Sequence, residues 1–143
     1  ETKDLSKVEI KTYVEELVAD LVASYDISNT VSIESRIQNC YINLTELTPL
    51  ALIINEIITN SMKYGLKEVE DPIISIALNQ TVIGDTVLEV SDNGHGFDKT
   101  IWEEHQTMGI ELIKTLTEQL DGTIELSQDS GHPVYLLKFK ATL

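Results

Sequence analysis

The chain has 143 residues, of which 42% are hydrophobic and 24% are charged; these proportions are typical of one globular domain and argue against intrinsic disorder or a fibrous structure. Ten Lys and Arg residues stand against 24 Asp and Glu residues, for a formal net charge of −14, so DNA, RNA and anionic membrane surfaces are poor partners. The one cysteine, Cys40, allows no internal disulfide, and no apolar run is long enough to span a bilayer.

Hydrophobic periodicity and turn signals divide the chain into helices and strands. Ser6 and Glu9 have the spacing of a capping box, and the apolar residues after them recur with nearly the period of a helix. Thr48-Pro49 has the residues of a helix start, with Thr as the cap and Pro at the first helical position, and Gly65 fits a helix end. The predicted elements, in chain order, are a helix over 2–27, strands over 31–37 and 41–44, a helix over 48–64, strands over 72–78 and 86–90, an irregular segment over 97–108, a helix over 109–120, and strands over 123–126 and 134–139.

The order of these elements predicts the fold class. Pairs of strands alternate with single helices, which indicates a mixed or antiparallel sheet with helices on one face, a two-layer α/β (α+β) sandwich. The chain has no internal repeat, low-complexity tract or interdomain linker, so residues 1–143 are predicted to form a single domain. Because the chain starts at Glu1 rather than Met, we expect it to be part of a longer protein.

The second predicted helix carries the first group of candidate functional residues. Glu56, Asn60, Lys63 and Lys67 fall at i, i+4, i+7 and i+11, which predicts that they share one helix face. The acid can orient or deprotonate a nucleophile, the amide oxygen can bind a hard cation such as Mg²⁺, and the amine can contact a phosphate. An ordinary solvated helix face is the alternative. The buried face is predicted to consist of Leu50, Ile53, Ile54, Ile57, Ile58 and Ser61.

The second candidate motif is Asp92-Asn-Gly-His-Gly96, which follows directly after a predicted strand. Two glycines at this spacing let the backbone turn tightly and approach a ligand closely. An ionised Asp92 only accepts hydrogen bonds, so it suits an exocyclic amine such as that of adenine. The alternative is a plain hairpin turn, because Asn-Gly is a common turn dipeptide.

The third candidate motif is Thr107-Met-Gly109-Ile110, at the start of the third predicted helix. A glycine there lets phosphate oxygens reach the free N–H groups and the positive end of the helix dipole. Such a site would bind an anion without many lysines, although the glycine alone is also compatible with an ordinary helix start.

In this order, the three motifs resemble those of the ATPase superfamily of gyrase, heat-shock chaperone, histidine kinase and mismatch-repair proteins. Residues 55–64 resemble its N box, residues 92–96 its first glycine box and residues 107–110 its second glycine box. The chain is most similar to the ATP-binding catalytic domain of a sensor histidine kinase, in the subgroup with a shortened ATP lid; Tyr13-Val-Glu-Glu-Leu and the run Leu50 to Asn60 resemble that subgroup. The resemblance covers nearly the whole chain and implies a Bergerat-type fold, with a mixed, mainly antiparallel sheet.

The resemblance implies ATP and Mg²⁺ as ligands and a role for each matching residue. Glu56 would orient the nucleophile or accept its proton, Asn60 would bind Mg²⁺, and Lys63 would contact phosphate. Residues 97–108 would form the lid. The nucleotide-binding residues are expected to be Asn60, Lys63, Tyr64, Asp92 (to the adenine amine), Gly94, Gly96, Thr107, Met108, Gly109 and Ile110.

Two departures from the family pattern affect these assignments. The second glycine box usually has an earlier glycine where Thr107 stands, and Gly131-His-Pro replaces the Gly-Thr that is common near the final strand. Lys99 or Lys114 could supply a further phosphate contact, although nothing in the sequence requires it.

The implied function is transfer of the γ-phosphate of ATP to a histidine on a separate dimerisation domain of the same protein, and from there to a response regulator. The three histidines, His95, His105 and His132, lie outside the predicted helices, so we expect the acceptor domain upstream of Glu1. The domain itself is expected to be cytoplasmic and monomeric, without direct membrane contact. Two alternatives are a serine kinase of the anti-sigma-factor type and a non-catalytic nucleotide-binding scaffold.

Overall fold

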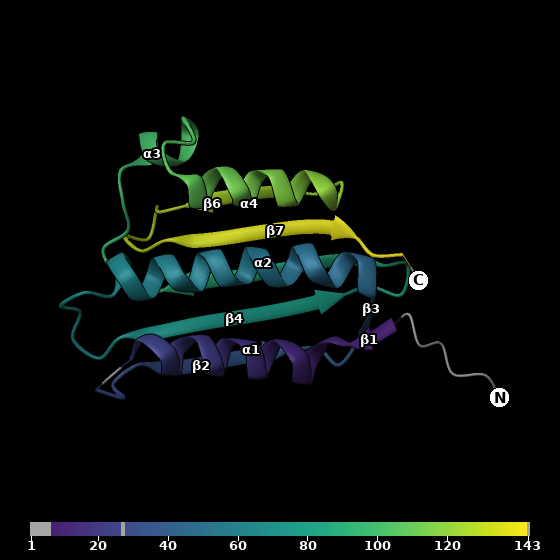
Figure 1. Cartoon of the computed structure of the whole chain (residues 1–143), viewed down its shortest axis with the longest axis horizontal. Coiled ribbons are helices and arrows are strands. Elements are labelled where there is room, and N and C mark those ends of the chain that lie inside the picture. The colour runs from purple at the N-terminus through teal and green to yellow at the C-terminus, as the bar shows by residue number, and fades with distance from the viewer. Residues whose placement is uncertain (1–6, 27, 143) are drawn as a thin grey trace.

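The computed structural model describes residues 7–26 and 28–142, and Figure 1 shows the long helices side by side over one face of a sheet. No helix of this described part is long and apolar enough to cross a membrane. The elements are β1 (Lys7–Glu9), α1 (Ile10–Tyr25), β2 (Ser32–Ile37), β3 (Tyr41–Asn43), α2 (Leu44–Asn60), the π-helical turn η1 (Ser61–Gly65), β4 (Ile73–Gln80), β5 (Asp85–Asp92), α3 (Lys99–Glu103), α4 (Met108–Gln119), β6 (Thr123–Ser127) and β7 (Val134–Lys140).

The main sheet has five strands in the order β2-β4-β5-β7-β6. Strand β2 runs parallel to β4, and the other neighbours are antiparallel. The short strands β1 and β3 form a separate antiparallel pair. These observations confirm the predicted two-layer sandwich with a mixed, mainly antiparallel sheet and helices on one face.

The core lies between the helices and the sheet. Each long helix has an apolar stripe, and the central strands alternate between buried and more exposed side chains. The predicted stripe of α2 is confirmed, since all six of its residues are buried. Cys40 is also buried, and burial raises the pKa of its thiol, which makes it an unreactive core residue. Other buried side chains include Ile10, Val14 and Val18 of α1, Ile74, Ile76 and Leu78 of β4, Leu88 and Val90 of β5, Ile113 and Leu116 of α4, and Leu137 of β7.

The predicted start of the first helix is wrong. Lys7–Glu9 forms strand β1, and the helix begins at Ile10. Glu9 pairs with Tyr41 of β3 and has extended backbone angles, so it does not belong to a capping box. Pairing with a strand more than thirty residues away outweighed the local helical period. The predicted helical residues 2–6 and 27 lie outside the described part of the chain.

The predicted start of the second helix is also wrong. Helix α2 begins at Leu44, and Pro49 lies inside it rather than at its first position. Leu47 and Pro49 are both buried. Their burial compensates for the hydrogen bond that a proline cannot donate within a helix. The predicted end near Tyr64 is confirmed to within one residue, because the helical backbone continues through η1 to Gly65, but the C-cap is Leu66 rather than Gly65.

Candidate functional site

An apolar cavity lies at the end of the sheet where α2 ends and α4 begins. It has a volume of about 400 Å³. Its walls come from α2, η1, the end of β5, the lid (residues 97–108), the first turn of α4 and the start of β7. The N box and both glycine boxes contribute to this one cavity, although they are separated in the sequence.

One end of the cavity is formed where α2 packs against the first turn of α4. A Cβ atom at Gly109 would lie 2.9 Å from Oε2 of Glu56 and 3.9 Å from both side-chain polar atoms of Asn60. Glycine at this position leaves the carboxylate where it is, whereas a larger residue would make it shift. A carboxylate, an amide and a helix N-terminus therefore meet at one point, as the resemblance implied.

The lysines of the predicted polar face separate in the structure. Lys63 lines the cavity, and its ammonium group lies 5.8 Å from the centre of the Tyr25 ring. Lys67 is exposed and does not line the cavity. The extrapolation of the face to Lys67 is wrong because the helical backbone ends at Gly65.

A π-helical turn at the end of α2 determines where the next side chains point. The N–H of Leu66 donates to the carbonyl oxygen of Ser61 at 2.8 Å, an i to i+5 hydrogen bond. Such turns often occur at functional sites. This turn places Ser61 inside the molecule, while Tyr64 is 71% exposed and lines the cavity mouth.

Asp92 is the buried acid of the cavity, with only 6% of its surface exposed. Its Oδ2 accepts a 2.6 Å hydrogen bond from the Ser61 hydroxyl, and its Oδ1 accepts one of 2.7 Å from the Gly94 N–H. These bonds satisfy part of a buried carboxylate and fix its orientation. Sequence reasoning missed the role of Ser61, although a serine within an apolar stripe is a signal for a buried polar contact.

The first glycine box owes its glycines to close packing. A Cβ atom on Gly94 would collide with the carbonyl group of Gly65, so Gly94 supports Asp92 from behind rather than lining the cavity. Gly96 does line the cavity, and its φ of +71° lies in the left-handed region that favours glycine.

Tyr135 of β7 is a lining residue that the sequence did not reveal. It is buried, and burial raises the pKa of its phenol far above the ordinary value, with the charge of Asp92 as a second cause. The phenol therefore remains neutral at every physiological pH. The only signal in the sequence was the position of Tyr135 in a strand with alternating apolar residues. That pattern indicates burial but does not indicate a contact with a cavity.

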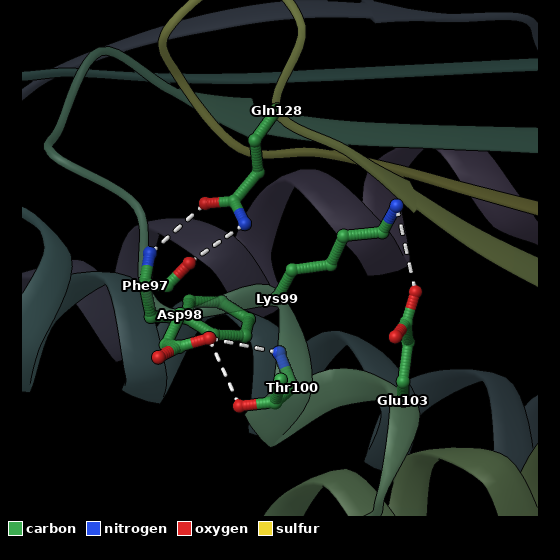
Figure 2. Close-up of polar contacts among 6 residues, drawn as sticks. All are labelled: Phe97, Asp98, Lys99, Thr100, Glu103 and Gln128. Atoms are coloured by element: carbon green, nitrogen blue, oxygen red, sulfur yellow. Dashed lines mark hydrogen bonds and ion pairs between the residues drawn. The ribbon is translucent and has the colours of Figure 1, made fainter.

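The sequence predicted an irregular segment over the lid. This prediction is wrong in part, because the lid contains helix α3. Asp98 caps this helix by accepting hydrogen bonds from the N–H and hydroxyl of Thr100, and Lys99 pairs with Glu103 at 3.5 Å (Figure 2). Trp102 is buried, with its ring edge-to-face with Tyr135 at a centroid distance of 5.7 Å.

The two lysines considered as further phosphate contacts are engaged outside the cavity. Lys99 pairs with Glu103, and the ammonium group of Lys114 lies 4.4 Å from the centre of the Trp102 ring. Neither lysine lines the cavity.

The second glycine box forms the first turn of α4. The Thr107 hydroxyl accepts a hydrogen bond of 3.2 Å from the N–H of Ile110, so threonine acts as the N-cap. Thr107, Gly109 and Ile110 line the cavity, whereas Met108 is 88% exposed and does not line it.

The described residues contain no group of three or more His, Cys, Asp and Glu side chains that could hold a metal by themselves. Oxygen donors are nevertheless present, since Asn60 and Glu56 lie beside each other across from Gly109. Amide and carboxylate oxygens suit Mg²⁺, which commonly takes its remaining ligands from substrate phosphates and water. The residues therefore fit a magnesium ion bound together with a phosphorylated ligand.

Residues 45–142 match the family described as histidine kinase-, DNA gyrase B- and HSP90-like ATPase. The chain belongs to this family. It is accordingly an ATP-binding domain. The residues that resemble the N box lie on α2 and η1, and those that resemble the glycine boxes lie at the end of β5 and at the start of α4. No curated protein has a significantly similar sequence.

Solved structures of histidine kinases share the fold. The histidine kinase domain of the blue-light activated histidine kinase from Erythrobacter litoralis EL346 matches with a TM-score of 0.85 at 9% identity, over 98% of this chain and 66% of that chain. Acinetobacter baumannii histidine kinase AdeS matches with a TM-score of 0.74 at 15% identity, over 99% of this chain and 70% of that chain. Mycobacterial sensor histidine kinase MprB matches with a TM-score of 0.72 at 12% identity, over 94% of this chain and 96% of that chain. The chain thus spans slightly less than two thirds of the first of these structures, and at these identities the likeness shows the fold alone.

Proposed function

We propose that this domain binds Mg-ATP and donates the γ-phosphate to a histidine on a separate dimerisation domain of the same protein. The phosphoryl group would then pass to an aspartate of a response regulator. The observation that carries the proposal is the meeting of Glu56, Asn60 and Gly109 at one end of a cavity that also contains the buried Asp92. Histidine kinases among the structures with this fold support the choice of acceptor.

The two kinds of polar group suit the two parts of a nucleotide. Asp92 offers fixed acceptor oxygens in an otherwise apolar wall, which suits the exocyclic amine of adenine. The N-terminus of α4 and Lys63 suit phosphate oxygens. Asn60 would hold Mg²⁺, which when bound neutralises phosphate charge. Phosphoryl transfer needs mainly positioning and charge neutralisation, which this arrangement supplies in a protein with a net charge of −14.

Glu56 is the residue best placed to act on the acceptor. Its carboxylate lies beside Gly109, next to the proposed position of the transferred phosphate. There it would orient the attacking imidazole or accept its proton. We infer that this residue contributes to transfer and little to nucleotide affinity.

Isothermal titration with a non-hydrolysable ATP analogue tests the binding step. We expect Mg²⁺-dependent binding by the wild type and a loss of affinity of about 10- to 100-fold or more in Asp92→Ala, because a hydrogen bond to a charged group is removed. Asn60→Ala should abolish the dependence on Mg²⁺. Asp85→Ala is the matched control, because Asp85 is an exposed acid at the other end of β5. The absence of binding at millimolar nucleotide would contradict the proposal.

A second assay tests the acceptor. The chain is mixed with the histidine-bearing dimerisation domain encoded by the same gene and with ATP labelled on the γ-phosphate. We expect a phosphoryl group that acid removes and alkali does not, as for phosphohistidine, and strongly reduced labelling with Glu56→Gln at unchanged nucleotide affinity. An acid-stable, alkali-labile product would indicate the serine kinase instead, and binding without transfer would indicate the scaffold.

A further inference from the structure

The connection between β6 and β7 contacts the first glycine box from the opposite side of the cavity wall. We call residues 128–133 the brace turn. Its members Gln128 and His132 do not line the cavity. Gln128 contacts the backbone of the first lid residue, and His132 contacts the backbone of a residue between β5 and the lid. Gln128 belongs to no motif that the sequence pointed to, and His132 lies in the Gly131-His-Pro that departs from the family pattern.

Gln128 binds both backbone groups of Phe97, the first residue of the lid. Its Oε1 accepts from the Phe97 N–H at 2.9 Å, and its Nε2 donates to the Phe97 carbonyl oxygen at 2.8 Å (Figure 2). Phe97 lies outside the helices and strands, so its backbone has no ladder partner. The side-chain amide of Gln128 satisfies the backbone N–H and carbonyl groups of Phe97, as a neighbouring strand would in a sheet.

His132 binds the glycine box itself. Its Nδ1 lies 2.7 Å from the carbonyl oxygen of Gly94. Because a carbonyl oxygen can only accept, Nδ1 carries a hydrogen and donates it. A backbone bond from the N–H of Asp92 to the carbonyl oxygen of Pro133, at 3.4 Å, adds a third contact between the two segments.

The braced segment would otherwise have unusual freedom. Gly96 has a φ of +71°, and a Cβ atom there would collide with Oε1 of Gln128. Glycine loses more conformational entropy on ordering than any other residue. The chain between Asp92 and Phe97 contains two glycines, and both of its ends line the cavity.

We propose that Gln128 and His132 are positioning residues that hold the first glycine box and Phe97 in their nucleotide-binding conformation. They touch no nucleotide and act through Gly94 and Phe97. The proposal rests on the proposed nucleotide binding and adds to it a set of residues from the far strand. Its physical basis is preorganisation, because a segment that is already ordered pays less entropy when a ligand binds.

The test compares Gln128→Ala and His132→Ala with the conservative variant His132→Asn and with Asp129→Ala, an exposed neighbour in the same turn. Two measurements are made on each full chain, below its melting temperature. One is the Kd for ADP with Mg²⁺ by calorimetry. The other is hydrogen exchange at the Phe97 amide in the nucleotide-free protein, which reports the brace without any ligand.

We expect Gln128→Ala to raise the Kd about tenfold and to speed exchange at the Phe97 amide by a similar factor, because two hydrogen bonds to neutral groups are lost. His132→Ala should raise the Kd about threefold for one such bond. His132→Asn should restore the Kd to within about twofold of the wild type, since the asparagine Nδ2 occupies nearly the position of Nδ1 and also donates. Asp129→Ala should match the wild type in both measurements.

Three outcomes would overturn the proposal: an unchanged Kd in Gln128→Ala, an unchanged exchange rate at Phe97, or an equal loss of affinity in Asp129→Ala. A merely structural role predicts a lower melting temperature without rescue of affinity by His132→Asn. A wild-type chain that bound no nucleotide would contradict the proposed function. In that case the exchange rates would still decide whether Gln128 holds Phe97.

Discussion

The two walls of the cavity are built in different ways. The wall formed by α2 and η1 rests on fully buried side chains such as Ile53, Ile54 and Ile57. The lid opposite rests on a helix of five residues, whose cap and ion pair are exposed and whose one deeply buried side chain is Trp102. Segments with few buried apolar contacts open locally at low free energy. We infer that the α2 wall opens only when the whole domain unfolds, whereas the lid opens by itself.

The largest effect is expected from Gly94→Ala, because the added side chain would collide with the wall formed by α2 and η1. The new Cβ would meet the Gly65 carbonyl, and backbone on both sides leaves no flexible group to move aside. We expect the free energy of unfolding to fall by about 3 kcal/mol or more, at the upper end for overpacking, together with loss of nucleotide binding. Chemical denaturation and calorimetry measure both.

Gly131→Ala is the matched control for that change. Gly131 has a φ of +90° but nothing within 4 Å of a Cβ atom, so only the left-handed backbone penalty of about 1–2 kcal/mol applies. Equal losses in the two variants would show that the contact with Gly65 costs no more than the left-handed strain at Gly131, and would contradict the expected collision.

A pair of truncations compares the two walls directly. Ile57→Ala should lower the global free energy of unfolding by roughly 2–5 kcal/mol, because a fully buried side chain is removed. Trp102→Ala should lower it by less than the roughly 3–5 kcal/mol of a core tryptophan, and instead open the lid. Denaturation gives the first quantity, and the rate of proteolytic cleavage within residues 97–108 gives the second. A global loss in Trp102→Ala as large as in Ile57→Ala would show that the lid belongs to the same cooperative unit.

The smallest effect concerns the cap of the lid helix. The Thr100 N–H holds the pKa of the Asp98 carboxyl below its ordinary value, and the Thr100 hydroxyl adds to this. A lowered pKa means that the cap contributes above the unfolded pKa of about 4 and is lost as pH falls through the folded pKa. We expect the fluorescence of Trp102, the one tryptophan, to report lid loosening below about pH 4.

Asp98→Asn separates this titration from that of the other acids. Asparagine is also a good N-cap but does not titrate, so the lid of this variant should stay closed at acid pH where that of the wild type loosens. If both proteins lost the Trp102 signal at the same pH, the cap of α3 would not be the group that titrates.

The residues that could be identified from the sequence are those whose role follows from the residues next to them in the chain. The stripe of α2, the alternation of β4 and β5, and the spacing of Glu56 and Asn60 follow from the periods of helix and strand, and each was confirmed. The order of three motifs was sufficient to indicate the family, which residues 45–142 match.

The errors arose where a distant partner changed a local preference. Lys7–Glu9 pairs with β3 instead of starting a helix, and Pro49 lies inside α2 because it is buried there. Lys67 leaves the polar face because the helix ends at Gly65. No periodicity in a single segment records such partners.

By itself, the sequence determined most of the element types, the apolar faces and the chemical groups available to bind a nucleotide, because these depend on neighbours within a few residues. Only the tertiary structure decided which groups meet. Ser61 reaches Asp92 across thirty-one residues, Gln128 reaches Phe97 across the same separation, and His132 reaches Gly94 across thirty-eight. These contacts depend on the strand order β2-β4-β5-β7-β6, which places the end of β5 beside the start of β7. Strand order is a property of the whole packed chain, and therefore no local pattern in the sequence could reveal which of these groups meet.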